Sequence, residues 1–419
     1  MESVLPSRAA QPIDRQWCVA ADAADPLAPL RSRFHIPDGL VYLDGNSLGA
    51  LPVGALEKVD RVVRKEWGDG LIASWMKAGW IDQALRLGDR LAPLLGAGAG
   101  QVLVCDTTTV NLQRLLTAVL ERSSRRVVLT EQENFHTDLY AASGVARMLG
   151  AELRMVPRTE LEAALDDSVS VLMLTHVDYR TGEMHDHRRL TEAAHAVGAM
   201  ALWDLCHSVG AVPLALDDAE VDLAVGCGYK YLNGGPGAPA FLYVATRHQR
   251  QLDSPLRGWL GHRDPFAFAI EYEPADGIRR QLVSSPSILG MAALEAALDV
   301  FADVDMAELR EKSLALTTTF MDLVESRCAG SGLRLATPRD PHRRGSQVAL
   351  AHEQAYGVVQ ALIERGVVGD FRAPDIARFG FAPLYLRFLD VWEAVDRLAG
   401  VLADGAHLDP RHAVRAAVT

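Results

Sequence analysis

The sequence has few cysteines and no excess of basic residues. Its five cysteines are odd in number, widely spaced and without a C-x-x-C pair: Cys18, Cys105, Cys206, Cys227 and Cys328. This pattern argues against a disulfide scaffold and a structural zinc site, and it favours a reducing compartment, expected to be the cytoplasm. Lys and Arg number 42 against 54 Asp and Glu, which gives a net charge of −12. Without a basic stripe, neither nucleic acid nor an anionic membrane surface is an expected partner.

Long apolar runs, internal repeats and low-complexity tracts are also missing. No stretch reaches the roughly 18 apolar residues of a membrane span, and residues 1–16 lack the basic and apolar regions of a signal peptide. Hydrophobic residues make up 49% of the 419-residue chain and charged residues 23%, which is ordinary for a globular protein with a large core. At roughly 100–200 residues per domain, the chain has room for two to three domains.

Short β-rich runs alternate with amphipathic segments from about residue 100 onward. The pattern predicts strands at 101–105, 126–130, 152–156, 171–175, 200–203, 221–225 and 240–244, and helices at 53–67, 109–121, 138–149 and 190–197. Strands that alternate with helices require crossover connections between parallel neighbours. The predicted fold class is therefore α/β, a three-layer, mostly parallel sheet with helices on both faces.

The pattern changes near Ser285. Helices at 287–301, 306–328 and 391–403, mixed with strands at 347–350, 367–369 and 385–388, predict a smaller α+β domain. Residues 1–40 are polar and are expected to form an irregular arm. We therefore divide the chain into an N-terminal arm that contributes to the site (1–50), a large α/β domain that holds the ligand (51–285) and a small C-terminal domain (286–419).

Polar residues follow several of the predicted strands, where parallel sheets bind their ligands. Asp204 ends one strand, and a later strand runs out into Lys230. Pyridoxal phosphate needs such a pair: the lysine forms a Schiff base, and the aspartate keeps the pyridine nitrogen protonated. Thr107–Thr109 open a helix whose amides suit a phosphate, and Phe135 offers a ring for stacking. Each feature alone is more often a cap, a core residue or a surface lysine, but their order together favours this cofactor.

Eight segments between residues 42 and 388 then match one enzyme family in order. They are YLDGNSLG (42–49), TTVNL (108–112), NFHTD (134–138), VDYRTG (177–182), DLCHS (204–208), GYKYLNGGPG (228–237), RGWLGH (257–262) and LYLRF (384–388). Through them the sequence resembles the kynureninases, pyridoxal-phosphate enzymes of the aspartate aminotransferase fold group. The runs GYKYLNGGPG and RGWLGH are the most specific. The resemblance implies that the large domain has the fold of the pyridoxal-phosphate-dependent transferases.

The resemblance also implies a role for each matching residue. Lys230, Asp204 and Tyr229 would be catalytic: Lys230 bonds to the cofactor, Asp204 binds the pyridine nitrogen, and Tyr229 lies by the phosphate and can donate a proton. Further cofactor contacts in the same chain are implied for Thr108, Thr109, Phe135, His136, Thr137, Asp138, Asp178 and His207. Trp259 and Ser285 would reach the phosphate from the partner subunit of a homodimer. For the substrate, Arg387 would bind the α-carboxylate, and Asn46 and Ser47 would line the amino-acid end.

Three residues depart from the family pattern. His136 stands where proline is usual, and Ser285 stands where Asn or Thr is usual. Cys206 replaces a small residue between Asp204 and His207. The first two changes keep or add hydrogen-bonding capacity, so modest effects are expected, and Cys206 is expected to be an inert buried thiol.

The implied reaction is the hydrolysis of L-kynurenine or 3-hydroxy-L-kynurenine, at the Cβ–Cγ bond, to L-alanine and the corresponding anthranilate. The sequence does not separate the two substrates, nor tryptophan catabolism from NAD biosynthesis or secondary metabolism. The alternative is another enzyme of the fold group, such as a cysteine desulfurase, a selenocysteine lyase or an aminotransferase. A desulfurase needs a mobile cysteine in a late loop, and the only late cysteine, Cys328, is predicted at a helix end.

Two further features have competing interpretations. Trp67, Trp75 and Trp80 either wall an aryl pocket or serve as packing anchors. The run His185-Asp186-His187 has no third ligand at a suitable spacing, so no metal site is predicted, and a solvated turn at a helix start is expected instead.

Overall fold

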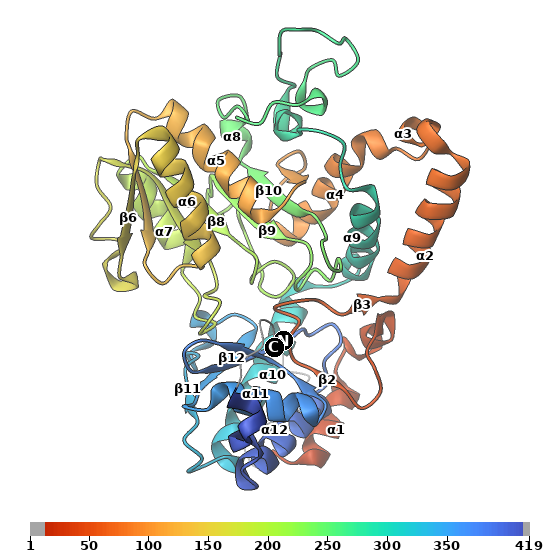
Figure 1. The fold of residues 1–419 in the computed structure, drawn as a ribbon, viewed down its shortest axis with the longest axis vertical. Helices are drawn as coiled ribbons and strands as arrows, with labels where there is room; N and C mark the ends of the chain where they lie inside the picture. The colour runs from red at the N-terminus through yellow and green to blue at the C-terminus, as the bar shows by residue number, and fades with distance from the viewer. Residues whose placement is uncertain (1–12, 414–419) are drawn as a thin grey trace.

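A computed structural model describes residues 13–413 of the chain. The first twelve residues of the predicted arm, and most of the segment examined for a signal peptide, lie outside the described residues. Figure 1 shows two parts, an upper one built on a large sheet and a lower one that holds both described ends of the chain. None of the helices within residues 13–413 combines the length and apolar character needed to cross a bilayer.

The upper part contains a seven-stranded sheet in the order β4-β10-β9-β8-β7-β5-β6. The strands are β4 (Val102–Val104), β5 (Val127–Glu131), β6 (Glu152–Val156), β7 (Val169–Thr175), β8 (Met200–Asp204), β9 (Leu223–Cys227) and β10 (Ala240–Val244). Neighbours from β9 to β6 are parallel, whereas β10 runs antiparallel to β9 and β4. The predicted mostly parallel sheet is confirmed.

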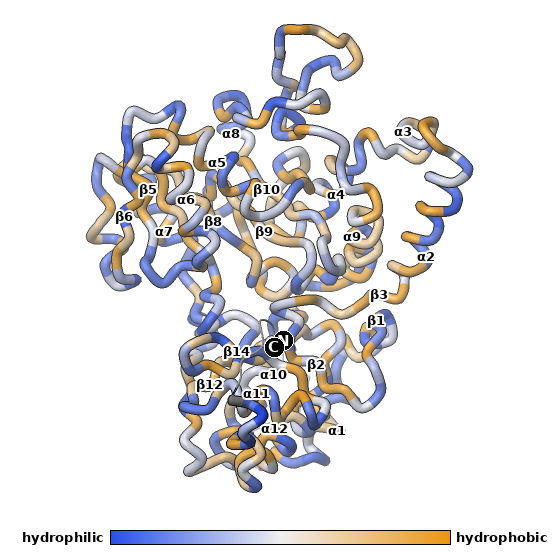
Figure 2. The backbone as a smooth tube through the Cα atoms, in the orientation of Figure 1, coloured by the Kyte–Doolittle hydropathy of each residue, from blue (hydrophilic) through white to orange (hydrophobic). Residues whose placement is uncertain are grey.

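The central strands are apolar along their whole length because helices cover the sheet. Every residue of β7, β9 and β10 is buried, and β9 and β10 can be followed among the apolar segments of the tube in Figure 2. Helix α5 (Thr108–Arg122) packs on α6 (His136–Leu149) and contacts β7, β9 and β10, while α7 (His187–Ala196) packs on β8. Runs with no polar alternation are what a sheet covered on both faces requires.

Several shorter helices complete the upper part. They are α2 (Val53–Arg61), which continues as a π-helical segment to Asp69, α3 (Ser74–Lys77), α4 (Gln83–Leu91) and α8 (Thr246–Gln249). Helix α9 (Ile288–Phe301) packs on α2 and α4. It therefore lies with the sheet-bearing part, although the predicted division places it in the C-terminal domain. The predicted domain bounds remain a proposal.

The lower part is built on a four-stranded antiparallel sheet in the order β11-β12-β15-β14. Its strands are β11 (Arg334–Leu335), β12 (Gln347–Ala351), β14 (Asp370–Arg372) and β15 (Ile376–Gly380), and its helices are α10 (Met306–Arg327), α11 (Ala355–Glu364) and α12 (Phe388–Ala403). The predicted strand at 385–388 is wrong. Arg387 is instead the N-cap of α12, because Asp390 accepts a hydrogen bond from the Arg387 backbone amide at 2.9 Å.

The prediction of an irregular arm over residues 1–40 is also wrong for its described portion. Asp14 caps α1 (Arg15–Ala24) by accepting from the Trp17 amide at 2.7 Å, and α1 packs on α12. Asp22 of α1 accepts from the Phe388 amide at 2.6 Å. Further along, β2 (Val41–Tyr42) pairs in parallel with β13 (Val367–Val368), and the short strands β1 (Phe34–His35) and β3 (Leu51–Pro52) pair with each other. The arm is thus fastened to the C-terminal part.

Candidate active site

The parallel register brings the carboxyl ends of three strands to one edge of the sheet. Thr175, which ends β7, pairs with Asp204, which ends β8, and Asp204 pairs with Val225 of β9. Strand β9 ends at Cys227, and the chain continues directly to Tyr229 and Lys230. The predicted aspartate and lysine therefore leave adjacent strands at the same edge, the usual ligand position of this architecture.

The ammonium group of Lys230 lies over two aromatic rings. Its Nζ is 5.9 Å from the ring centroid of Phe135 and 6.0 Å from that of Tyr229. Phe135 immediately precedes α6, and its ring lies 5.2 Å from the ring of Tyr179 and 4.4 Å from that of His136. A planar group attached to Lys230 would meet the face of an aromatic side chain.

Two buried carboxyl groups, Asp138 and Asp204, face each other beside the lysine. Thr175 Oγ1 donates to Asp138 Oδ2 at 3.2 Å, and the Cys206 amide donates to Asp204 Oδ1 at 2.6 Å. Burial, followed by the charge of Asp204 and a hydrogen bond to it, raises the pKa of Asp138 well above its usual range. Asp138 therefore keeps its proton, and the pair presents a single negative charge to whatever binds there.

The start of α5 lies against the loop that follows Asp204. Thr107 caps this 15-residue helix by accepting from the Val110 amide at 3.3 Å, and Thr108 Oγ1 lies 3.6 Å from Cys206 Sγ. Thr108 and Thr109 form the first turn, where backbone amides lack partners within the helix. Such a turn favours an anion such as phosphate. Thr137 lies in the corresponding first turn of α6, between His136 and Asp138.

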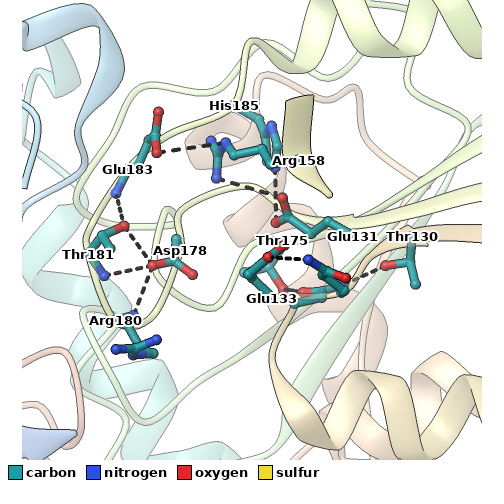
Figure 3. Close-up of polar contacts among 12 residues, drawn as sticks. Thr130, Glu131, Glu133, Arg158, Thr175, Asp178, Arg180, Thr181, Glu183 and His185 are labelled. Carbon is teal, nitrogen blue, oxygen red and sulfur yellow. Dashed lines mark hydrogen bonds and ion pairs between the residues drawn. The ribbon is translucent and has the colours of Figure 1, made fainter. Parts of the chain in front are cut away.

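His207 is held by a contact with the C-terminal part, and Asp178 is held by contacts within its own turn. His207 Nδ1 lies 2.8 Å from Gln347 Oε1. Burial, with the charges of Lys230 and Arg378, lowers the pKa of His207 well below its usual range, so the ring is neutral. Asp178 Oδ1 accepts hydrogen bonds from the Arg180 amide and from Thr181, which fixes the tight turn drawn in Figure 3.

A second charged cluster joins the arm to the C-terminal sheet. Arg378 Nε donates to Asp370 Oδ1 at 2.8 Å, and its Nη2 donates to Ser47 Oγ at 2.9 Å. Arg372 Nη2 donates to Asp370 Oδ2 at 2.6 Å. Burial acts to raise the pKa of Asp370, but the two guanidinium groups outweigh it and lower that pKa. The predicted residue Ser47 is therefore joined to two arginines.

The charges of this cluster do not balance. Asp44 lies close enough to sense Asp370 and Arg378, and burial, then Asp370, raises its pKa to about 7. At and below neutral pH, two guanidinium groups thus face one fully ionised carboxylate. The amide of Asn46 is 1% exposed, and neither its nitrogen nor its oxygen has a hydrogen-bond partner among residues 13–413. Excess positive charge beside an unpartnered amide suits a carboxylate ligand.

The structure does not bring Arg387 to this cluster, which corrects the expected substrate contact. Its guanidinium pairs with Asp390 (Nη2–Oδ1, 2.7 Å), three residues on in α12. Arg387 and Asp390 line a cavity of about 760 Å³ together with Arg31 and Phe34 of the arm. The physical reason is that residues 385–387 form no strand and lead into α12, so Arg387 caps that helix and its side chain pairs with Asp390.

Within residues 13–413 of one chain, neither Trp259 nor Ser285 makes a hydrogen bond or ring contact with the Lys230 cluster. Trp259 contacts Trp75 (5.7 Å between centroids) and Phe266 (5.8 Å), and Ser285 is exposed ahead of α9. Trp75 also meets Trp80 at 6.4 Å, whereas Trp67 is largely exposed. The three tryptophans therefore split into a packed pair, next to Trp259, and one surface residue.

The turn at residues 185–187 is solvated only in part, because His185 is buried whereas Asp186 is exposed. His185 is buried and its Nε2 lies 3.1 Å from Glu131 Oε1, a contact drawn in Figure 3. Asp186 caps α7, and the His187 ring lies 4.9 Å from that of His176. The expected helix start is confirmed, and His185, just before it, packs against the end of β5. Among residues 13–413, no group of three or more His, Cys, Asp and Glu is arranged to hold a metal ion.

Sequence reasoning missed several residues that complete these clusters: Tyr179, Gln347, Asp370, Arg372 and Arg378. Arg378 carried a usable signal, because it interrupts an otherwise apolar strand run from Ile376 to Phe381. A charge in such a run is buried only with a partner or a ligand. Gln347 carried no signal, since its role depends on how two distant segments pack.

The residues around Lys230 fit pyridoxal phosphate. A lysine over an aromatic face, a carboxyl pair with one net negative charge for the pyridinium, and a helix start for the phosphate match the three parts of that molecule. The Arg378 cluster matches the carboxylate of an amino-acid substrate.

The two carboxyl groups are expected to respond differently to amidation. Asp138→Asn keeps a neutral side chain, so cofactor binding and kcat should stay within about threefold of wild type, whereas Asp204→Asn removes the negative charge and should lower kcat by at least ~10²-fold. Cofactor content by absorbance and steady-state rates on both variants check this. Equal losses in the two variants would contradict the assignment of the charge to Asp204.

The chain is similar to several known proteins. The family description "Kynureninase C-terminal domain" matches residues 309–398. A curated relative named kynureninase from Burkholderia pseudomallei (strain 1106a) is 53% identical over 413 residues, covering 97% of this chain and 99% of the relative. Among solved structures, the cysteine desulfurase CsdA from Escherichia coli has a TM-score of 0.76 at 20% identity, over 91% of this chain and 98% of that chain. A C-DES variant with glycine linked covalently to its pyridoxal-phosphate cofactor also has a TM-score of 0.76 at 20% identity, over 89% and 99% of the two chains.

The two structural neighbours show the fold: the sheet-bearing part has the architecture that those pyridoxal-phosphate enzymes share. The full-length relative carries the further conclusion, because more than half of its residues are identical across nearly the whole of both chains. The chain therefore belongs to the kynureninase family.

Proposed function

We propose that this protein uses pyridoxal phosphate to hydrolyse L-kynurenine, or its 3-hydroxy derivative, to L-alanine and the corresponding anthranilate in tryptophan catabolism. The observation that carries the proposal is the pairing of two centres. The lysine-aspartate centre at the strand ends suits the cofactor, and the Arg378 cluster suits an α-carboxylate. Tyr179 links them, since its ring lies 5.2 Å from Phe135 and its carbonyl accepts from Arg378.

Substrate binding follows from the charges in the second centre. The two guanidinium groups hold the α-carboxylate, and the Asn46 amide nitrogen gives it a neutral donor, while Ser47 accepts from both arginines and keeps them in place. The substrate amine is then directed toward Lys230. Because the amine and the carboxylate are both held on the α carbon, its remaining bonds, to the α hydrogen and to the β carbon, take a defined orientation.

Proton transfers use groups whose protonation states the site sets. Bound pyridoxal phosphate supplies an electron-withdrawing ring that stabilises negative charge at the α and β carbons. Lys230 removes the α proton, while Asp204 holds the charge that keeps the ring withdrawing. Burial, then Cys227, raises the pKa of Tyr229, so its phenol keeps its proton and can give it to the β carbon once water has cleaved the bond to the γ carbonyl.

A cysteine desulfurase, the main alternative, is less supported. That reaction needs a nucleophilic cysteine that reaches the substrate. Cys328 lies at the end of α10, is 7% exposed, and burial raises its pKa to about 11. All five cysteines are buried. The fold shared with desulfurases therefore does not extend to their chemistry.

Incubation of the purified protein with L-kynurenine is expected to release anthranilate and L-alanine in equal amounts, because one bond is cleaved by one water. Anthranilate fluorescence and an alanine assay measure this, with 3-hydroxy-L-kynurenine run in parallel to establish preference. The Lys230→Ala variant is the control and should be inactive. No alanine from either substrate would overturn the proposed function.

Paired arginine variants test which guanidinium binds the substrate. Arg378→Lys keeps the charge but loses the planar fork, so KM for L-kynurenine should rise about tenfold, the equivalent of one charge-assisted hydrogen bond. Arg387→Lys makes the same replacement at a helix cap and should leave KM within about twofold of wild type. A larger KM change in Arg387→Lys than in Arg378→Lys would contradict this assignment and favour Arg387 as the residue that binds the α-carboxylate.

We further propose that the protein is a homodimer whose partner subunit contributes Trp259 and Ser285 to the cofactor site. Support comes from the loop 263–272, where Phe266, Phe268 and Ile270 are 58%, 88% and 104% exposed. This loop protrudes from the upper part in Figure 1 and continues the chain directly from Trp259. Apolar side chains at such exposure are more stable when covered by another surface.

The dimer proposal predicts activity from a mixture of two inactive proteins. Lys230→Ala and Trp259→Ala each disable a site, but in a mixed dimer Lys230 of one chain meets Trp259 of the other. If subunits exchange freely, about a quarter of all sites should regain activity. Rates of the mixture after refolding together measure this, with each variant refolded alone as control. A mixture no more active than its components would contradict a shared site.

The cytoplasm is the proposed location, supported by cysteine use. The five cysteines are buried free thiols. Reducing conditions preserve that state.

A further inference from the structure

Gln347 is a fully buried amide that touches the cofactor-site loops from the other part of the molecule. It is the first residue of β12, in the C-terminal sheet, and is 0% exposed. Its Oε1 lies 2.8 Å from His207 Nδ1, and its Nε2 donates to the carbonyl oxygens of Asp178 at 3.0 Å and Tyr179 at 3.2 Å. Both polar atoms of its side chain therefore contact residues that flank the site.

The direction of each hydrogen bond follows from the chemistry of the groups. Backbone carbonyls only accept, so the end of the amide that faces Asp178 and Tyr179 is the NH₂ group. The oxygen is left to face His207, and an amide oxygen also only accepts. His207 Nδ1 must therefore carry the proton. Because the buried ring is neutral, its other nitrogen, Nε2, has a lone pair and acts as an acceptor.

The loop that encloses Gln347 leaves it little freedom to turn. A Cβ at Gly182 would lie 2.7 Å from Gln347 Cγ and 3.1 Å from its carbonyl oxygen. Gly182 has a φ of +74°, a conformation that glycine adopts without strain. The 178–182 turn thus closes directly over the side chain, which fixes the amide in the orientation that the hydrogen bonds require.

We propose that Gln347 is a positioning residue that holds His207 in the Nδ1-protonated tautomer, so that His207 Nε2 can only accept a hydrogen bond at the cofactor site. Gln347 belongs to the C-terminal sheet and His207 to the loop after β8, so this tautomer depends on the two parts being docked. The inference rests on the proposed function only for the identity of the site. It assigns Gln347 no direct contact with substrate or cofactor.

The tautomer can be measured in the cofactor-loaded protein with ¹⁵N-labelled histidine. The chain has 13 histidines, and a His207→Gln sample identifies the signals of His207. We expect ¹⁵N shifts of a protonated Nδ1 and an unprotonated Nε2 in the wild type. A wild-type His207 with a protonated Nε2 would overturn the proposal without any further variant.

Variants then test whether Gln347 sets this state. Gln347→Met removes the amide, so the His207 signals should lose the Nδ1-protonated pattern and the absorbance spectrum of the bound cofactor should change. We expect kcat to fall about tenfold and KM to change less, as is typical when a residue that orients a histidine is removed. Gln347→Glu keeps an oxygen acceptor and should retain the Nδ1 proton. An unchanged His207 pattern in Gln347→Met, or loss of the Nδ1 proton in Gln347→Glu, would contradict the proposal.

Gln249 provides a matched control. Its Nε2 also donates to two backbone carbonyls, those of Gly100 at 2.8 Å and Val244 at 3.0 Å, at similar burial but in a different part of the molecule. Gln249→Met should leave the His207 signals and the cofactor spectrum unchanged. Turnover of L-kynurenine by the wild type reports separately on the proposed function, so failure of one conclusion is distinguishable from failure of the other.

Discussion

The parallel pairing of β7, β8 and β9 is the constraint on which the rest of the site depends. Their register aligns Thr175 with Asp204 and Asp204 with Val225, so the segments that follow the three strands leave the sheet at one edge. A one-residue shift in any pair would move side chains to the opposite face of the sheet. The carboxyl pair, the lysine and the start of α5 meet only because this alignment is maintained by fully buried strands.

Two charge centres of opposite sign suit the cofactor and the amino-acid substrate. The Asp138–Asp204 pair retains one negative charge, and the Arg372–Arg378 pair retains excess positive charge after Asp370 is counted. The first centre lies on the large sheet and the second on the C-terminal sheet. Tyr179 and Gln347 connect them through backbone and side-chain contacts. Docking of the two parts therefore assembles the site.

The sequence predicted the elements whose signal is local. All seven strands of the large sheet lie within two residues of their expected positions at each end, because buried apolar runs and turn residues mark them. Lys230 and Asp204 followed from their places at strand ends. Arg387 was named through the family resemblance and Arg378 was missed, because only tertiary packing separates a helix cap from an arginine that faces the Ser47 and Asp370 cluster. Helix α1 was missed because its apolar face has only three buried residues, Trp17, Cys18 and Ala21. Packing against α12, which the sequence does not show, is what buries them.

The account's central claim is that the cofactor bonds to Lys230 at this sheet edge. Reduction of the cofactor-loaded protein with borohydride fixes the cofactor to its lysine, and mass spectrometry of the digested protein then locates it. The chain has only five lysines, Lys58, Lys65, Lys77, Lys230 and Lys312, so the assignment is direct. The account predicts a pyridoxyl group on Lys230 alone. A label on another lysine, or none on Lys230, would contradict it.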